Sequence, residues 1–333
     1  MSRYHDAHIN PAGPGDARPA ALQIIQDENL IDQMGDKVFL ITGCSSGIGV
    51  ETARAIAKTG AKVFLGIRNP EEGKNACADF LNPGRVEILQ IDTSSLSSVR
   101  ATAASFLERS PTLNVLICNA GVMQIPERQE SVDGFELQLA TNYLGHFLLF
   151  YLLKDALLKG AAQSPGFNSR LVNVSSSGHH SSEIRFDDIN LEEEGSYDPH
   201  GAYGQSKLAQ IYMANYVDRH YGPKGIHALS LMPGGIRTGL QKFVPKEIID
   251  GWASKPAVLS FMKSTEQGAS TTVVAAVSKE WEGRGGKYLE DCAEAPIATP
   301  ESRWSGVKKY AYDEEKENRL WELTLQMLGI ERA

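Results

Sequence analysis

The chain has 333 residues, of which 42% are hydrophobic and 22% are charged. This composition is close to globular averages, so it excludes a disordered or collagen-like chain and allows one large domain or two ordinary ones. The formal net charge is −8 and no basic block occurs, which makes nucleic acid and anionic membrane surfaces poor partners.

The N-terminal residues 1–20 are polar and rich in Pro and Gly, and they lack the apolar core of a signal peptide. We expect them to form a disordered or loosely docked arm. The most apolar stretch, 144–158, contains Lys154 and Asp155 and is too short to span a bilayer, so it predicts a buried helix and no membrane anchor. The cysteines lie far apart without a CxxC pair, which argues against disulfides and zinc and suits a reducing compartment. We expect a soluble, cytoplasmic protein.

Short β-branched apolar runs alternate with amphipathic segments along most of the chain. The runs predict strands over 37–42, 61–67, 86–91, 114–118, 170–175, 226–232 and 287–290. The amphipathic segments predict helices over 21–34, 49–59, 97–109, 132–159, 202–221 and 311–330. Continuous apolar strands separated by helices indicate a parallel sheet of about seven strands covered on both faces. We therefore expect residues 21–333 to form a single α/β domain of the doubly wound, Rossmann type.

Two connections, 179–200 and 240–267, are longer than the others, and long loops near strand ends are common places for substrate contacts. We expect 240–267 to form a substrate lid. Its apolar side chains suit a bulky lipophilic substrate, although they could equally pack the lid onto the sheet: Leu240, Phe243, Val244, Trp252, Leu259, Phe261 and Met262.

A glycine-rich loop follows the first predicted strand and precedes a helix. Its pattern is GxxxGxG, with Gly43, Gly47 and Gly49, and no GK[ST] follows. Glycines allow a tight turn and a close approach of a pyrophosphate, and the helix N-terminus supplies free N–H groups. The loop therefore predicts a dinucleotide site, and the alternative is a βα turn without a ligand.

The end of the second predicted strand indicates which dinucleotide binds. NAD sites place an acidic residue there to bond the ribose hydroxyls, whereas this chain has Arg68. A guanidinium matches a 2′-phosphate in charge and geometry, so we expect NADP(H). The alternative is a surface arginine paired with Glu71 or Glu72.

Taken together in this order, the motifs resemble those of the short-chain dehydrogenase/reductase family. They are TGxxxGxG at 42–49, Asp92, Asn119-Ala120-Gly121, Asn142, the serines at 175–177, Tyr203-xxx-Lys207 and Pro233-Gly234 with Thr238. The sequences Cys-Asn-Ala-Gly, Thr-Asn-Tyr-Leu-Gly-His-Phe and Gly-Lys-Tyr-Leu-Glu-Asp-Cys are most similar to the retinol-dehydrogenase-like and WW-domain-oxidoreductase-like branch. That branch includes many fungal reductases of secondary metabolism. The resemblance also implies a homodimer or homotetramer.

Four residues are the catalytic candidates. Tyr203 and Lys207 lie four positions apart in a predicted helix, so both project from one face, and a cation beside the phenol lowers its pKa. The resemblance implies that Ser176 orients the substrate, with Ser175 and Ser177 as alternatives. It also implies that Asn142 holds a water that links Lys207 to solvent, and the alternative is a core asparagine satisfied by backbone groups.

The resemblance assigns further residues to the cofactor. Asp92 would accept a hydrogen bond from the adenine, unless it caps the following helix. Thr238 would contact the carboxamide or the pyrophosphate. The full set of expected cofactor-binding residues is Gly43, Ser45, Ser46, Gly47, Ile48, Gly49, Arg68, Asp92, Thr93, Asn119, Ala120, Gly121, Tyr203, Lys207, Pro233, Gly234, Ile236 and Thr238.

These residues predict an NADPH-dependent oxidoreductase that interconverts a bulky lipophilic ketone or aldehyde and its alcohol, with Tyr203 as acid/base. Carbonyl reduction is the expected direction. Two alternatives remain: non-redox chemistry in the same site, and a non-enzymatic NADPH-binding scaffold. We expect no metal site, with His179 and His180 as surface histidines in a polar loop. Cys44 is expected to be a small residue of the glycine loop, unless the helix N-terminus activates its thiol.

Overall fold

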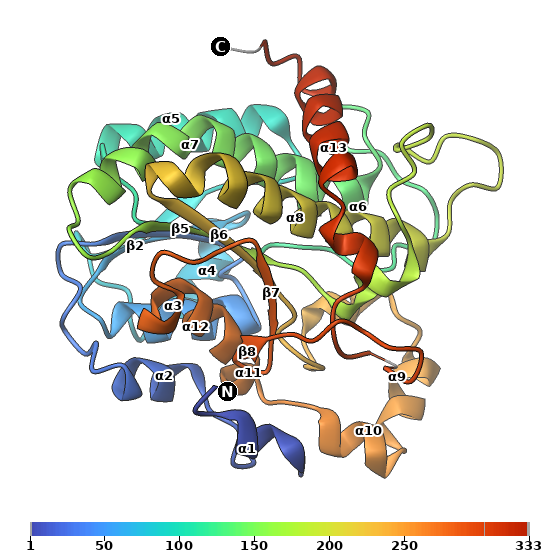
Figure 1. Ribbon diagram of the computed structural model, residues 1–333, viewed down its shortest axis with the longest axis horizontal. Helices are drawn as coiled ribbons and strands as arrows, with labels where there is room; N and C mark the ends of the chain where they lie inside the picture. The colour runs from blue at the N-terminus through green and yellow to red at the C-terminus, as the bar shows by residue number, and fades with distance from the viewer. Residues whose placement is uncertain (1, 303, 332–333) are drawn as a thin grey trace.

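An eight-stranded sheet with the order β3-β2-β1-β4-β5-β6-β7-β8 runs through the computed structural model (Figure 1). The structure describes residues 2–302 and 304–331, so residues 1, 303, 332 and 333 of the predicted arm and domain lie outside the described residues. The strands are β1 Val38–Thr42, β2 Lys62–Ile67, β3 Val86–Gln90, β4 Val115–Cys118, β5 Ser169–Val174, β6 Ile226–Leu231, β7 Lys287–Glu290 and β8 Ala293–Glu294.

The parallel sheet predicted from the apolar runs is confirmed. Strands β1 to β7 all pair in parallel, and each begins and ends within one residue of its predicted bounds. The short β8, which pairs antiparallel with β7, was not predicted. It follows a tight turn in which Asp291 and Cys292 both have positive φ, a conformation that the apolar periodicity does not reveal.

Helices cover both faces of the sheet, and each face has its own hydrophobic core (Figure 1). On one side lie α5 Leu96–Arg109, α7 Gly145–Ala162, α8 Pro199–Tyr221 and α13 Glu314–Met327. On the other lie α2 Ala21–Asp27, α3 Ile48–Ala57, α4 Pro70–Cys77 and α12 Ser270–Val277. Between them the two cores bury nearly every apolar side chain of β1, β4, β5 and β6.

The remaining helices are short: α1 His5–Ile9, α6 Leu137–Leu139, α9 Lys246–Ala253, α10 Pro256–Phe261 and α11 Thr265–Gly268. The C-terminal α13 lies across α8 and α7, where the Trp321 ring stacks on Tyr216 at 4.0 Å and contacts Phe147 at 4.6 Å. It therefore covers part of both helices. None of the helices formed by the described residues is both long enough and apolar enough to cross a membrane.

Two predicted helices differ from the observed ones. The helix expected over 21–34 ends at Asp27, because the backbone N–H groups of Asp32 and Met34 donate to carbonyls of Lys58 and Thr59 at the end of α3. The helix expected over 132–159 begins only at Leu137 and contains a π-helical turn, Ala140–Leu144, before α7. Such a turn inserts one extra residue into a helix, and it is frequent at functional sites.

Candidate active site

A cavity of about 520 Å³ opens at the carboxyl ends of strands β1 to β6, the edge at which open α/β sheets bind ligands. The tertiary structure brings together there all the predicted cofactor-binding residues and three of the four predicted catalytic ones. The predicted residues that line it are Gly43, Ser45, Ser46, Gly47, Ile48, Gly49, Arg68, Asp92, Thr93, Asn119, Ala120, Gly121, Ser176, Tyr203, Lys207, Pro233, Gly234, Ile236 and Thr238.

The glycine loop has the geometry of a phosphate cradle. Gly43 and Gly47 have φ of 77° and 64°, which side chains disfavour. A Cβ on Gly43 would lie 2.8 Å from the Cα of Ala120, and one on Gly49 would lie 2.2 Å from the carbonyl of Gly43. No side chain caps the N-terminus of α3, so its first N–H groups remain free for a ligand. These features fit a dinucleotide pyrophosphate.

The thiol of Cys44 faces away from this chemistry. It is fully buried and donates to the carbonyl of Ile41 at 3.3 Å. Burial raises the pKa of Cys44 well above its usual range, so the thiolate is disfavoured. The interpretation as a small residue of the loop is confirmed.

At the end of β2, Arg68 is exposed and lines the cavity. Among the described residues, its guanidinium forms no ion pair, because Glu71 pairs with Lys74 and Glu72 accepts from the Asn69 amide. The alternative of a surface arginine held by these two acids is therefore wrong. Asp92 accepts hydrogen bonds from Ser94, and α5 is capped by Ser95 instead, so the cap alternative for Asp92 is wrong too.

The geometry distinguishes among the three serines. The Ser175 hydroxyl donates to the backbone carbonyl of Lys207 at 2.7 Å and is buried, whereas Ser177 does not line the cavity. The Ser176 side chain lines the cavity, accepts from the N–H of Gly178 and interacts with the Tyr203 phenol. Of the three, Ser176 alone combines access to the cavity with contact to Tyr203.

Tyr203 and Lys207 project from one face of α8 into the cavity floor and are only 6% and 3% exposed. The Lys207 ammonium donates to the carbonyl of Val174 at 2.8 Å and to Oε1 of Gln210 at 2.9 Å, and it lies 5.7 Å from the centroid of the Tyr203 ring. Burial raises the pKa of Tyr203 to about 12. The interaction with Ser176 lowers this pKa, but by less than burial raises it. The expectation that Lys207 lowers this pKa is therefore wrong for this arrangement.

The pKa of Lys207 is itself lowered to about 7 by burial. At neutral pH the Tyr203 phenol is thus protonated and can donate a proton. The nearby Lys207 gains or loses its own proton near pH 7. The arrangement can orient a carbonyl oxygen with two hydroxyl groups and protonate it.

Comparisons with known proteins agree with this site. Residues 37–186 match the family model of short chain dehydrogenases. The chain is 53% identical over 329 residues to short-chain dehydrogenase/reductase prx1 of Penicillium roqueforti, covering 98% of this chain and 95% of that protein. The chain belongs to the short-chain dehydrogenase/reductase family.

Two other matches support this assignment. Human retinol dehydrogenase 12 is 34% identical over 301 residues, covering 90% of this chain and 88% of its own, which confirms the resemblance to the retinol-dehydrogenase-like branch. A crystal structure of a Mycobacterium paratuberculosis protein superposes with a TM-score of 0.66 at 30% identity, covering 89% of this chain and 94% of that one.

In this short-chain dehydrogenase/reductase, Asn142 lies behind the cavity wall, in the π-helical turn. Its side-chain amide exchanges hydrogen bonds with the backbone of Val122 and donates to Ser206, which is the arrangement of the core-asparagine alternative. The backbone carbonyl of Asn142 faces Nδ1 of His146 at 2.9 Å, and Nε2 of His146 faces the Thr42 hydroxyl at 2.8 Å. The predicted role of Asn142 in holding a water that links Lys207 to solvent stays a prediction.

The expectation that His179 and His180, in the loop after β5, are surface histidines is wrong. His179 is fully buried, and His180 is half-buried with Nε2 against the carbonyl of Gly306 at 3.0 Å. The local sequence is polar, but the C-terminal segment folds over it, and no local pattern signals that contact.

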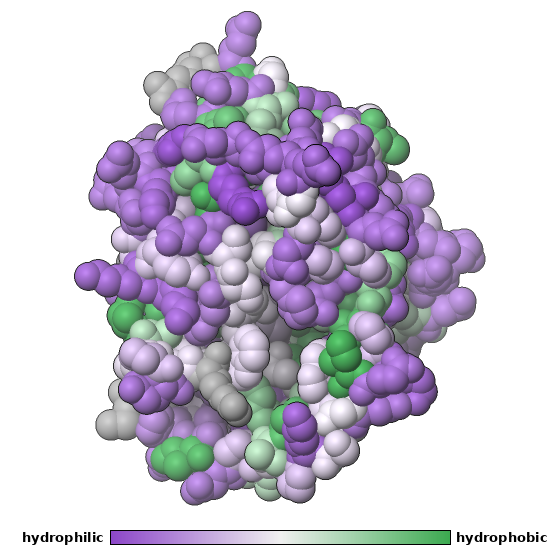
Figure 2. Space-filling model, turned by 90° about the vertical axis from the view of Figure 1, so that its right-hand side faces the viewer, coloured by the Kyte–Doolittle hydropathy of each residue, from purple (hydrophilic) through white to green (hydrophobic). Residues whose placement is uncertain are grey.

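The predicted lid contains a 3₁₀ turn, Gly239–Phe243, followed by α9 and α10. Of its apolar side chains, Leu240 and Phe243 line the cavity, whereas Trp252, Leu259 and Phe261 are more than a third exposed. Of the two interpretations, lining of the cavity therefore holds for Leu240 and Phe243 of this set. Figure 2 shows hydrophobic side chains on this face mainly in its lower half, at the height of α9 and α10 in Figure 1.

The cavity has further lining residues that the sequence analysis did not single out. Apolar ones are Met123, Ile125 and Leu137, which come from the segment after β4 and the start of the helix. Their spacing follows no periodicity, because that segment is irregular between 119 and 136. Only the folded loop places them in the same cavity as Phe243.

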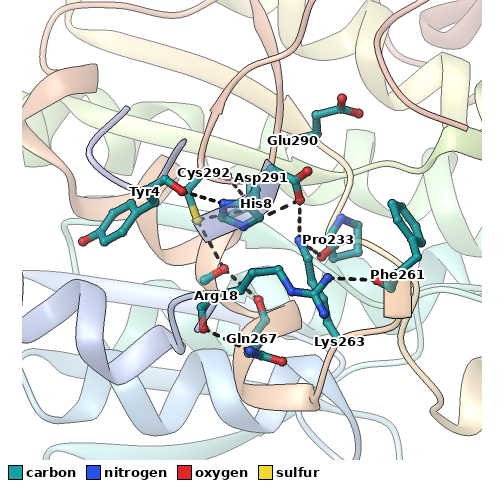
Figure 3. A network of polar contacts seen from close by, with 12 residues as sticks. Tyr4, His8, Arg18, Pro233, Phe261, Lys263, Gln267, Glu290, Asp291 and Cys292 are labelled. Atoms are coloured by element: carbon teal, nitrogen blue, oxygen red, sulfur yellow. Dashed lines mark hydrogen bonds and ion pairs between the residues drawn. The ribbon is translucent and has the colours of Figure 1, made fainter. Parts of the chain in front are cut away.

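The N-terminal segment is joined to the end of the lid rather than loosely docked (Figure 3). Arg18 is 4% exposed and donates to the carbonyls of Gly13, Phe261 and Met262, with its Nε on the carboxylate of Asp16. Next to it, the buried ammonium of Lys263 bonds Asp291 at 2.6 Å and faces the carbonyl of Pro233 at 3.3 Å. The arm thus holds the end of the lid, and the lid end contacts the cavity wall.

Proposed function

We propose that this short-chain dehydrogenase/reductase is an NADPH-dependent enzyme that interconverts a bulky lipophilic ketone or aldehyde and its alcohol. The convergence of Ser176, Tyr203 and Lys207 beside a glycine cradle in one cavity carries the proposal. When bound, the nicotinamide supplies the hydride chemistry. The chain's own residues would hold that cofactor, orient the substrate oxygen and move the proton.

In the proposed mechanism, Ser176 and Tyr203 both donate hydrogen bonds to the substrate carbonyl oxygen, and Tyr203 transfers its proton to that oxygen. A phenol whose pKa is raised to about 12 by burial is protonated at neutral pH, which is the form that carbonyl reduction requires of the proton donor. Lys207 would bond the ribose of the cofactor from the cavity floor.

Arg68 supports NADPH rather than NADH. It lies in the cavity without an ion pair to any described residue, and a charge-assisted bond to a 2′-phosphate is geometrically suited to its guanidinium. Glu72 also lines the cavity, but its carboxylate accepts from Asn69, so it is not free to replace the acid of an NAD site.

Part of the cavity lining is apolar and lies outside the predicted cofactor-binding residues. This part includes Met123, Ile125, Leu137, Leu240 and Phe243. Such a surface favours a lipophilic carbonyl over a sugar or a small acid.

The test follows NADPH oxidation with a panel of bulky lipophilic ketones and aldehydes, with NADH in parallel. We expect turnover with NADPH, weak turnover with NADH, and loss of turnover in Tyr203→Phe. Tyr221→Phe is the matched control, because it removes a phenol from the far end of the same helix and that residue does not line the cavity.

Three outcomes would contradict the proposal. Retained turnover in folded Tyr203→Phe would refute the mechanism. Product formation without net NADPH consumption would favour non-redox chemistry, and NADPH binding without any turnover would favour a scaffold.

A further inference from the structure

His179 occupies an unusual place for a histidine of a polar loop. It lies in a 3₁₀ turn, Ser177–Ser181, directly after Ser176, and its side chain is fully buried. Its ring contacts those of His180 and Tyr288, with centroids 4.5 and 5.0 Å away. A buried imidazole costs free energy unless both nitrogens have partners.

Both ring nitrogens do have partners, and the partners determine the tautomer. Nδ1 lies 2.6 Å from the backbone carbonyl of Ser176, which can only accept, so Nδ1 carries the hydrogen. The backbone N–H of Lys308 donates to Nε2 at 3.2 Å, so Nε2 is unprotonated. Burial lowers the pKa of His179 to about 3, and the neutral ring therefore persists across the physiological pH range.

Through these bonds the imidazole connects the Ser176 backbone to the C-terminal segment. The Tyr310 hydroxyl donates to the carbonyl of His179 at 2.7 Å, and the Tyr212 hydroxyl donates to the carbonyl of Tyr310 at 2.8 Å. Tyr212 belongs to α8, the helix that carries Tyr203. The serine turn and the tyrosine helix are thereby tied to the same segment, 306–312.

The turn held in this way contacts Tyr203 closely. The Gly178 N–H donates to the Ser176 hydroxyl at 3.0 Å, and a Cβ on Gly178 would lie only 2.7 Å from the Tyr203 ring. A serine hydroxyl is one rotatable bond from its backbone, so the position of the Ser176 carbonyl and of the turn determines where that hydroxyl points.

We infer that His179 is a positioning residue for the reaction: its neutral Nδ1–H tautomer holds the Ser176 backbone so that the Ser176 and Tyr203 hydroxyls converge on one substrate oxygen. This inference rests on the proposed function and adds to it a residue that does not line the cavity.

The test compares His179→Ala with His179→Asn, whose amide can donate in the place of Nδ1. We expect His179→Ala to lower kcat by about 10- to 100-fold, the range for a displaced catalytic group, with NADPH affinity within about twofold. His179→Asn should recover most of the loss. His220→Ala is the control, because it removes an exposed imidazole at the end of α8 that does not line the cavity.

A double-mutant cycle separates positioning from general destabilisation. If His179 acts through Ser176, then His179→Ala should have little further effect on kcat in a Ser176→Ala background. Three results would each overturn the inference. They are an equal loss of kcat in both backgrounds, an unchanged kcat in His179→Ala, and no recovery of kcat in a folded His179→Asn.

One readout does not depend on turnover. Hydrogen exchange of the amides in 176–181 should accelerate in His179→Ala and stay slow in His179→Asn. If the wild-type enzyme reduces no carbonyl, the proposed function fails and the role of His179 in that reaction fails with it. The exchange data then report on the turn alone: accelerated exchange in His179→Ala supports the contact through which His179 holds the turn, and unchanged exchange overturns it.

Discussion

Gly178→Ala is the substitution whose consequence follows most directly from the geometry. The new Cβ would lie 2.7 and 2.8 Å from Cε1 and Cδ1 of Tyr203, and 3.3 Å from the Ser176 hydroxyl. Gly178 does not have a positive φ, so the change acts through contact and not through backbone strain. To reach an ordinary separation of about 3.4 Å, the ring and the turn must move apart by about 0.7 Å.

A displacement of this size acts on the two groups that contact the substrate oxygen. A misplacement of about 1 Å can cost about 100-fold in rate, so we expect kcat to fall by about 10- to 100-fold. Overpacking costs about 1–3 kcal/mol, so the melting temperature should fall by only a few degrees.

The assay is steady-state NADPH oxidation, with cofactor affinity measured separately by fluorescence titration. Gly251→Ala is the control, because a Cβ there meets nothing within 4 Å and the position lies in helix α9. A Gly178→Ala protein with kcat within about twofold of wild type would refute the argument that this turn positions the hydroxyls.

Three further predictions follow from buried or free charges. Arg18→Gln removes the bonds to the carbonyls of Phe261 and Met262, so trypsin should cleave the lid faster at Lys255, and KM should rise more than kcat falls. Arg3→Gln is the control and should match wild type, because the Arg3 side chain is 54% exposed. Arg68→Ala should weaken NADPH binding by about 10- to 100-fold, the size of a lost charge-assisted bond, and leave NADH binding unchanged, whereas equal effects on both cofactors would contradict the 2′-phosphate contact. Burial raises the pKa of Glu290 to about 7 from 4.5, so the folded protein retains a proton that the unfolded chain loses and stability falls as pH rises from 4.5 to about 7. Glu290→Gln should therefore raise the melting temperature relative to wild type more at pH 8 than at pH 4, and an equal difference at both would refute this.

The sequence by itself determined the layered architecture and the cofactor side of the cavity. Apolar runs give strands because they must be buried on both faces, and the order of a parallel sheet brings all strand ends to one edge. The glycine loop, Arg68 and the Tyr203–Lys207 pair lie at those ends, so their meeting in one cavity followed from local patterns alone.

The tertiary structure alone decided how the site is held together. His179 lies in a polar stretch, yet it is buried by residues 306–310, more than 120 positions away in the chain. Arg18 lies in a Pro- and Gly-rich segment, yet it is buried against the lid end at 261–262. The Tyr203 pKa was expected to fall because a cation is near in sequence, but burial raises it, and the opposing interaction is the one with Ser176. Periodicity and propensity describe neighbours along the chain, whereas burial and hydrogen-bond partners depend on segments that meet only after folding.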